Sequence, residues 1–467
     1  MLTYFPNSIS RKAMTIYFVT LAMVSIVFMN KMLPFYMMLF GIVEVCSFFY
    51  FSNDLTKQWR LLHPKVFVQK LFWTSLIIRF VYTIFAYFFY DAMTGQPFMF
   101  HSADERVYYT MSQVWSQQGF EVFRNMVRGF GLGDSGEIYW TGFLCKVFGT
   151  YVLTARIGHC VLSAATCVLI YRIAKRHFGE STARMSAIFC MLMPNLIYYC
   201  GLHLKEADMV FVTVLFVDCI DAVLSEKRFD IKRIVLAVAA GFSLFTFRTA
   251  LGSVGLIAVL VAVVFIKGRL GSWWKRILLA VVVVVSLTTT TVGDRIMREA
   301  NELWEGRSTN QSIGMQARTQ RKGGNSFAKY ASGTLLAPMI FTIPFPTMVN
   351  TPYQENQQMI HGGNYVKNVV SGFTIFALFL LLLSGEWRKH TLPIAMMCGY
   401  LVVIAFSTYV MSERFHQPAL PFELMFAAVG ISQLKGKQFK WVDYWLIFVM
   451  VANMGWSWIK LAGRGLA

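Results

Sequence analysis

Long apolar runs separated by short polar segments make up most of this chain. Many of the runs contain about 18 or more residues, enough for a helix to cross a hydrocarbon core of about 30 Å. Apolar and polar positions do not alternate strictly within them, so the pattern indicates helices and not the strands of a barrel. The sequence therefore predicts an all-α integral membrane protein.

The runs predict about 13 transmembrane helices. Their expected ranges are 12–29, 33–52, 67–90, 152–173, 185–202, 206–224, 234–248, 251–267, 277–293, 367–384, 391–410, 416–434 and 441–459. Two longer connections remain, at about 91–151 and 294–366. Aromatic and apolar residues run through both, which favours folded loops with short helices over disorder.

The apolar stretch 335–348 interrupts the second long connection. It contains Pro338, Pro344 and Pro346, and a full span here would place the basic residues near 388–390 outside the cell. We therefore interpret it as an interfacial or re-entrant element, which membrane proteins tolerate where the chain is buried in protein. The pattern alone leaves open whether this stretch spans the bilayer.

Composition and charge set the class and the orientation. Hydrophobic residues make up 56% of the 467 residues and charged residues 14%, whereas soluble domains carry roughly a quarter charged residues. The formal net charge of +19 comes largely from short loops near 172–184, 227–233, 267–276 and 435–440. Short basic loops between spans are typically cytoplasmic. Membrane orientation therefore accounts for the positive charge, and we expect no nucleic-acid partner. The same rule leads us to expect that both long loops face outward.

An acidic motif follows the third predicted span. Asp104 and Glu105 open a segment, 103–123, whose apolar residues recur at helical spacing and include Tyr108. Carboxylates in a first turn favour the helix dipole, so the pair could merely start the helix. It could equally supply the acid or base of an active site in the first outer loop.

A glycine-rich turn lies farther along the same loop. Glycines at 131, 133 and 136 surround Asp134 and precede Glu137. Glycine permits the close approach of a ligand to the backbone, but the turn lacks the GK[ST] ending of a phosphate loop. A second acid site and a solvated turn both remain open.

The order of several short motifs resembles the GT-C superfamily of membrane glycosyltransferases. The motifs are the D-E-x-x-Y sequence at 104–108, Phe148-Gly149, Ala155-Arg156, Phe178-Gly179, and the Arg414-Phe415-x-x-Pro418-x-x-Pro421-Phe422 stretch. The similar branch is that of protein O-mannosyltransferases and the lipid A aminoarabinose transferase. On this resemblance, 66–434 forms the catalytic core, 1–65 adds two helices, and 435–467 adds a final helix and tail.

The resemblance implies a reaction. The donor would be a sugar on a polyprenyl phosphate, and the acceptor a hydroxyl of a glycan, lipid or protein at the outer face of the plasma (inner) membrane. The family's catalytic acid maps onto Asp104, with Glu105 beside it. A hydroxyl needs a base to attack an anomeric carbon, and a one-step displacement would invert that carbon. The expected activity is that of a hexosyl- or pentosyltransferase of the cell envelope.

Several polar residues are candidates for binding the substrate, and four of them are basic. Lys205, Arg248, Arg414 and His416 come at predicted outer ends of spans. Charges near a membrane are functional candidates, although each alone could be an interfacial side chain. Together they suggest binding of the donor phosphate, with Asp134, Glu137 and Tyr108 as further candidates.

The sequence leaves alternatives open for the cofactor and for the functional class of the protein. The resemblance allows a divalent metal, with Asp104, Asp134, Glu137 and His203 as candidate ligands, and no other cofactor is expected. A transporter or flippase of lipid-linked saccharides would tend to show charges at the midplane, and a polymerase would tend to rest on arginine-rich outer loops. The sequence does not define the sugar, the acceptor, the lipid length or the oligomeric state.

Overall fold

The computed structural model describes residues 2–118, 121, 135–225, 230–265, 325, 327, 339–407 and 410–466. Within these residues the regular structure is helical, apart from one isolated bridge between Met32 and Val349. The predicted all-α class is confirmed for this part of the chain. The predicted span 277–293, Asp134 and most of the second outer loop lie outside the described residues.

Long apolar helices support the membrane prediction. Among the described residues, six helices are long and apolar enough to cross a membrane. They are α1 (Asn7–Val27), α2 with the turn after it (Phe35–Leu61), α3 (Pro64–Thr94), α7 (Val152–Phe178), α17 (His361–Leu383) and α21 (Phe439–Ala462). The protein is therefore a multi-pass membrane protein by the character of its helices.

The other predicted spans within the described residues correspond to helices that are shorter or carry more charge. These are α8 (Glu180–Leu192), α9 (Pro194–Cys200), α10 (Glu206–Ser225), α11 (Ile231–Phe247), α12 (Thr249–Phe265), α18 (Thr391–Ala405) and α20 (Leu420–Gln433). The count of 13 spans stays a prediction.

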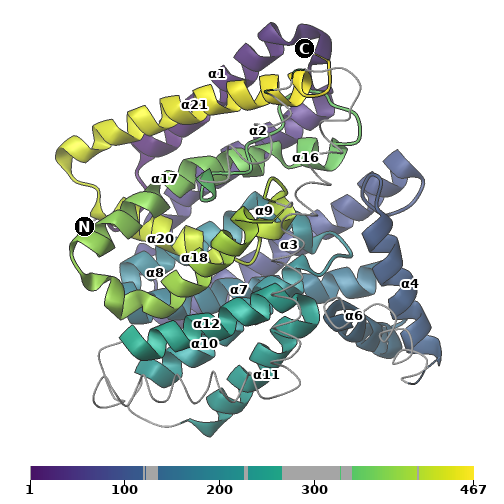
Figure 1. Ribbon diagram of the computed structural model, residues 1–467, viewed down its shortest axis with the longest axis vertical. Helices are drawn as coiled ribbons and strands as arrows, with labels where there is room; N and C mark the ends of the chain where they lie inside the picture. Colours follow the sequence, from purple (N-terminus) through teal and green to yellow (C-terminus); the bar gives the residue numbers. More distant parts are fainter. Residues whose placement is uncertain are drawn as a thin grey trace.

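Helix α7 occupies the middle of the bundle. It packs against α3, α8 and α10, while α17 packs against α20 and α2. Figure 1 shows α10, α11 and α12 on one side of α7, and α1, α2 and α21 on the other. The connection between α3 and α7 contributes α4 (Ala103–Gln118) and α6 (Ser135–Phe148), which pack on each other beside the bundle. Polar side chains near the beginning of α7 can therefore face both α6 and α10.

The two N-terminal helices are integrated into the bundle. Helix α1 lies along α21 and α2, and α2 also packs against α8 and α17. The Tyr17 hydroxyl lies 2.9 Å from Nε2 of His361, and the Tyr365 hydroxyl donates to the carbonyl of Ala13 at 2.7 Å. Residues predicted as additions to the core thus share buried polar contacts with α17.

One predicted span is interrupted by proline. The expected helix 185–202 is two helices, because Met193 adopts an extended conformation with ψ of 115° between α8 and α9. The residue before a proline disfavours the helical region, and Pro194 then begins α9. Helix α9 then leads into the loop that carries His203 and Lys205.

The described part of the apolar stretch 335–348 is not a long helix. Residues 342–348 are irregular and buried. The Lys367 ammonium donates to the carbonyl of Ile343 at 2.6 Å, and the Asn368 amide donates to the carbonyls of Thr342 and Pro344. Irregular backbone at membrane depth requires such partners, and α17 supplies them here.

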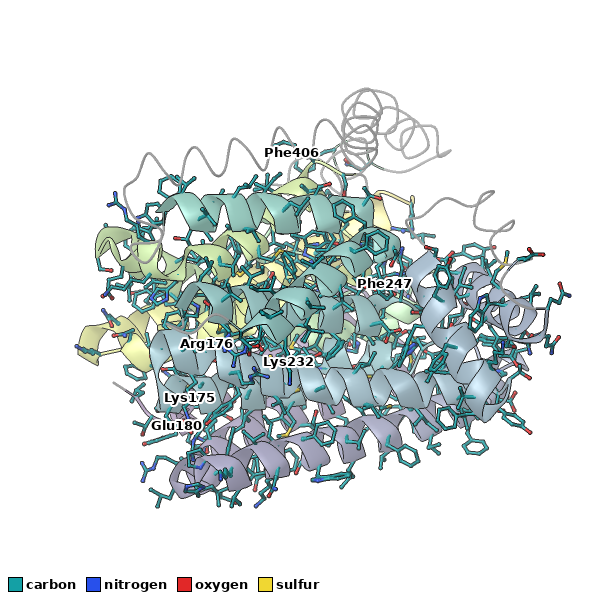
Figure 2. The ribbon with its side chains drawn as sticks, turned by 90° about the horizontal axis from the view of Figure 1, so that it is seen from below. Lys175, Arg176, Glu180, Lys232, Phe247 and Phe406 are labelled. Carbon is teal, nitrogen blue, oxygen red and sulfur yellow. The ribbon has the colours of Figure 1, made fainter. Side chains whose placement is uncertain are left out.

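The two ends of α7 carry different polar clusters. Arg156 and His159 lie near its beginning, and Arg176 lies near its end, where it donates to Asp218 at 2.7 Å and to Asp221 at 2.6 Å. The helical rise separates positions 156 and 176 by about 30 Å, which is about the thickness of a hydrocarbon core. Figure 2 labels Arg176 toward one end of the bundle and Phe247 farther toward the other.

Candidate active site

The first turn of α4 presents Asp104 to solvent. The Ser102 hydroxyl accepts the backbone N–H of Glu105 at 3.2 Å and so caps the helix. The Asp104 side chain is 56% exposed, whereas Glu105 and Tyr108 are buried. The amphipathic helix predicted over 103–123 is therefore observed over Ala103–Gln118, and Asp104 lies on its outward side.

Arg414 joins Asp104 to a second carboxylate. Its Nη1 donates to Oδ2 of Asp104 at 2.5 Å, and its Nε donates to Oε1 of Glu206 at 2.5 Å. Arg414 belongs to the short helix α19 (Glu413–His416), and Glu206 is the first residue of α10. The Arg414 side chain is 16% exposed. The contacts leave Oδ1 of Asp104 without a hydrogen-bond partner among the described residues.

Two further cations approach this cluster through its chain neighbours. The Arg248 guanidinium lies 4.2 Å from the ring centre of Phe415, and its Nη1 donates to the Tyr400 hydroxyl at 2.7 Å. The Lys205 ammonium donates to the carbonyl of Phe247 at 2.9 Å. Since Phe415 follows Arg414 and Phe247 precedes Arg248, contacts between chain neighbours link these predicted cations to the Arg414 cluster.

Glu105 has different surroundings from its neighbour. Its carboxylate accepts the backbone N–H groups of Met99 at 2.7 Å and His203 at 2.6 Å, and it pairs with Arg156 at 3.3 Å. Both charged side chains of that pair are fully buried. Glu105 therefore fixes the loops around α4 and is not presented to a substrate in this conformation.

The structure does not bring His416 to the Arg414 cluster. Its ring is buried, with Nδ1 2.9 Å from the Lys367 ammonium and Nε2 2.9 Å from the carbonyl of Val410. Both ring nitrogens thus have interior partners. His416 is placed to hold α19 against α17.

A second group of chemistry-bearing residues lies at the start of α7. Glu137 of α6, His159 of α7 and Asp208 of α10 each offer one ligand atom, and these atoms lie within 4.8 Å of one another. Of the metal-ligand candidates that the structure describes, which are Asp104, Glu137 and His203, only Glu137 belongs to this group. Asp104 lies outside it, and the ring centre of His203 lies 6.2 Å from that of His159.

Sequence reasoning missed His159 and Asp208. The available signal was a polar residue inside an apolar run, which is a functional candidate in a membrane protein. Arg156 and His159 are also separated by three positions, so they share one face of α7. Finding the group, however, required knowing that α6 and α10 both contact that face.

Burial affects the ionisation of this region. Burial, together with the charge of Asp208, raises the pKa of Glu137 above its usual value. Burial also lowers the pKa of His203 to about 3. Both shifts favour the uncharged forms, because a charge in a low-dielectric site loses its hydration. A stable ionised carboxylate here would need a compensating positive group.

The comparison with known families bears on the middle of the chain. Residues 138–292 match the family model of dolichyl-phosphate-mannose-protein mannosyltransferases. The matching segment begins in α6 and contains His159, Asp208 and Arg248, whereas Asp104 and Arg414 lie outside it. It covers 155 of the 467 residues. No curated protein matches the chain significantly.

The match supports similarity to a family of membrane glycosyltransferases. The family is named for dolichyl-phosphate-mannose, a sugar carried on a polyprenyl phosphate. The described apolar helices fit a multi-pass enzyme of this kind. The match does not separate the protein O-mannosyltransferases from the lipid A aminoarabinose transferase within the resembled branch.

Proposed function

We propose that the protein is a glycosyltransferase that moves a sugar from a polyprenyl-phosphate donor to an acceptor hydroxyl at the extracytoplasmic face. The observation that carries this proposal is the contact between the half-exposed Asp104 and Arg414. The contact engages Oδ2 of Asp104 with a cation and leaves Oδ1 free. The match of 138–292 supports the donor class.

Asp104 is the proposed base. The acceptor oxygen attacks the anomeric carbon, its proton passes to Oδ1 of Asp104, and the bond from that carbon to the phosphate oxygen breaks. The electron pair of this bond leaves with the polyprenyl phosphate. A single displacement inverts the anomeric centre, and its transition state is oxocarbenium-like. General-base catalysis of this type contributes about 10²- to 10⁴-fold.

The cations near Asp104 suit the leaving group. A phosphate that departs as an anion needs no proton but gains from fixed positive charge. Arg414 and Arg248 can each donate two hydrogen bonds to phosphate oxygens, and Lys205 adds a third positive charge. Stacking on Phe415 and donation to Tyr400 hold the Arg248 guanidinium in a defined orientation.

The extracytoplasmic orientation rests on the positive-inside rule. The last two turns of α7 carry Arg172, Lys175 and Arg176, and Figure 2 labels Arg176 at the end of the bundle away from Phe247. A cysteine at the exposed Gln96 should react with an impermeant thiol reagent added to intact cells, in a background lacking Cys46 and Cys398. A cysteine at the exposed Lys389 should react only after lysis. The reverse pattern would overturn the orientation.

The arrangement favours transfer over transport. A transporter places substrate-binding charges near the bilayer midplane between rocking halves. The cluster of Asp104, Arg414 and Glu206 instead forms where α4, α10 and α19 begin. A site at the ends of helices can hold the lipid phosphate at the interface while the acceptor approaches from water.

A donor screen tests this function. Membranes containing the protein are incubated with radiolabelled polyprenyl-phosphate hexoses and pentoses, and both sugar transfer and release of polyprenyl phosphate are measured. We expect one donor class to be consumed with Asp104 intact and not with Asp104→Asn. If no donor is consumed by either protein while the lipid-linked sugar crosses the bilayer, the flippase interpretation replaces this proposal.

A further inference from the structure

Glu137, His159 and Asp208 form a closed group between three helices. Their side chains are 0%, 0% and 1% exposed. Nε2 of His159 lies 3.3 Å from Oε1 of Glu137 and 3.3 Å from Oδ2 of Asp208. A tetrahedral ion with bonds of about 2.0–2.1 Å separates its ligand atoms by about 3.3–3.4 Å. The two distances from His159 match this spacing, and the ligand atoms of Glu137 and Asp208 lie within 4.8 Å of each other.

A hydrogen bond at Nδ1 of His159 determines which ring nitrogen carries the proton. Nδ1 of His159 lies 3.0 Å from the carbonyl oxygen of Leu202. A carbonyl only accepts, so Nδ1 carries the proton. In the neutral ring the lone pair is then on Nε2, directed at the two carboxylates. Metal-binding histidines usually have this arrangement, in which a carbonyl orients the ring from behind.

The buried negative charges of Glu137 and Asp208 also favour a bound cation. Both carboxylate oxygens of Glu137 and of Asp208, and Nε2 of His159, have no hydrogen-bond partner in the part of the chain that the structure describes. With a neutral imidazole the group carries two negative charges, and a divalent cation cancels both. A protonated imidazole would have one N–H for two carboxylates and would leave a net negative charge. Uncompensated buried charge is strongly destabilising.

We propose that Glu137, His159 and Asp208 bind a divalent transition metal of the zinc class. One imidazole nitrogen and two carboxylate oxygens suit such an ion, whereas magnesium and calcium prefer oxygen ligands alone. His203 is the nearest further imidazole, and both its ring nitrogens lack hydrogen-bond partners among the described residues. It is the candidate for the fourth position.

The metal would act as a cross-link and not as the group that reacts. It ties α6 and α10 to α7, directly beside the buried pair of Glu105 and Arg156, to which the backbone of His203 is bonded. It thereby fixes the framework on which Asp104 is mounted. This role does not depend on the proposed reaction, so the site can be tested without a sugar donor.

Metal content is the test. Purified, tag-free protein in detergent is equilibrated with zinc, freed of unbound metal, and analysed by mass spectrometry. We expect about one bound ion per chain for the wild type and for His361→Gln, a matched change of a buried histidine elsewhere. Affinity should fall by at least about tenfold in Glu137→Gln and Asp208→Asn, the scale on which even outer-shell changes act.

A measurement on the wild type alone tests the metal site even if the variants fail to fold. Cobalt bound at the site should give visible absorption of a nitrogen–oxygen site, zinc should displace it, and a chelator should lower the thermal unfolding temperature. If the wild type binds neither ion, or if the site variants bind as tightly as His361→Gln, the metal site is overturned. The group would then be a His159 imidazolium between two carboxylates.

Discussion

The guanidinium of Arg414 donates to Oδ2 of Asp104 across 310 positions of the chain. The same side chain is held from behind by Glu206, so its orientation is fixed by a fully buried carboxylate. Asp104 therefore has one oxygen engaged by a cation and one directed to solvent. This arrangement orients the carboxylate without blocking its second oxygen.

Because Arg414 bridges two carboxylates, we predict that a positive charge alone at this position does not support full sugar transfer. In Arg414→Lys the ammonium can contact one carboxylate but cannot span both with the same geometry. We expect kcat/KM for sugar transfer to fall by about 10- to 100-fold, equivalent to about 1.4–2.8 kcal/mol. The control is Arg60→Lys, at an exposed arginine. Equal rates for the wild type and Arg414→Lys would show that the bridge has no role.

Neutralising Asp104 and neutralising Glu105 should affect protein stability differently. Glu105→Gln leaves the buried Arg156 without its counter-ion, and breaking a buried pair costs about 3–5 kcal/mol. We expect the thermal unfolding temperature in detergent to fall clearly for Glu105→Gln. It should change little for Asp104→Asn, because an exposed ion pair contributes at most about 1 kcal/mol. Equal stability of the two variants would contradict the assigned roles.

Arg248 should act on the donor. In Arg248→Gln the stacking on Phe415 can persist, but the positive charge is lost. We expect KM for the polyprenyl-phosphate donor to rise by about tenfold, with a smaller change in KM for the acceptor. Arg388→Gln, at an exposed arginine of the opposite basic loop, is the matched control. An unchanged donor KM would remove Arg248 from the site.

The basic end of α7 predicts a pH effect on stability. Nδ1 of His177 lies 2.9 Å from Nδ1 of His390. Burial and this neighbouring ring lower the pKa of His390 to about 4. Between about pH 6.5 and 4 the unfolded chain therefore binds the proton more readily than the folded one. Stability should fall as the pH is lowered through this window, with a slope of at most about 1.4 kcal/mol per pH unit from this group.

The groups around His390 define the control for that measurement. His177 also contacts Asp221 through Nε2 at 2.8 Å, and Glu386 and Lys389 flank the ring along the chain. Unfolding temperatures are measured from pH 7 to 4.5 for the wild type and for His390→Gln. The variant should show the flatter profile. Identical profiles would assign the acid sensitivity to another group.

Much of the site could be predicted because its members lie at the ends of apolar runs. The start of α4, the loop before α10, the junction of α11 and α12, and α19 each carry a charge where a span begins or ends. The predicted topology then puts them on one side of the membrane. The hydrogen bond that joins Asp104 to Arg414 could not be predicted, because it depends on how these ends converge in space.

The two adjacent carboxylates show a second limit. Successive residues of a helix point about 100° apart, so Asp104 and Glu105 cannot share the same surroundings. The sequence does not say which of them faces solvent, because the direction is set by Met99, Arg156 and the backbone of His203. Those partners come from separate segments.

The central claim is that Asp104 is the base of the transfer reaction. The most direct measurement is the rate of sugar transfer by purified Asp104→Asn, at saturating donor and acceptor, beside the wild type and Asp91→Asn, an exposed acid at the end of α3. We predict a loss of about 10²- to 10⁴-fold for Asp104→Asn alone, with donor binding and unfolding temperature retained. A rate within a few-fold of the wild type would contradict the account.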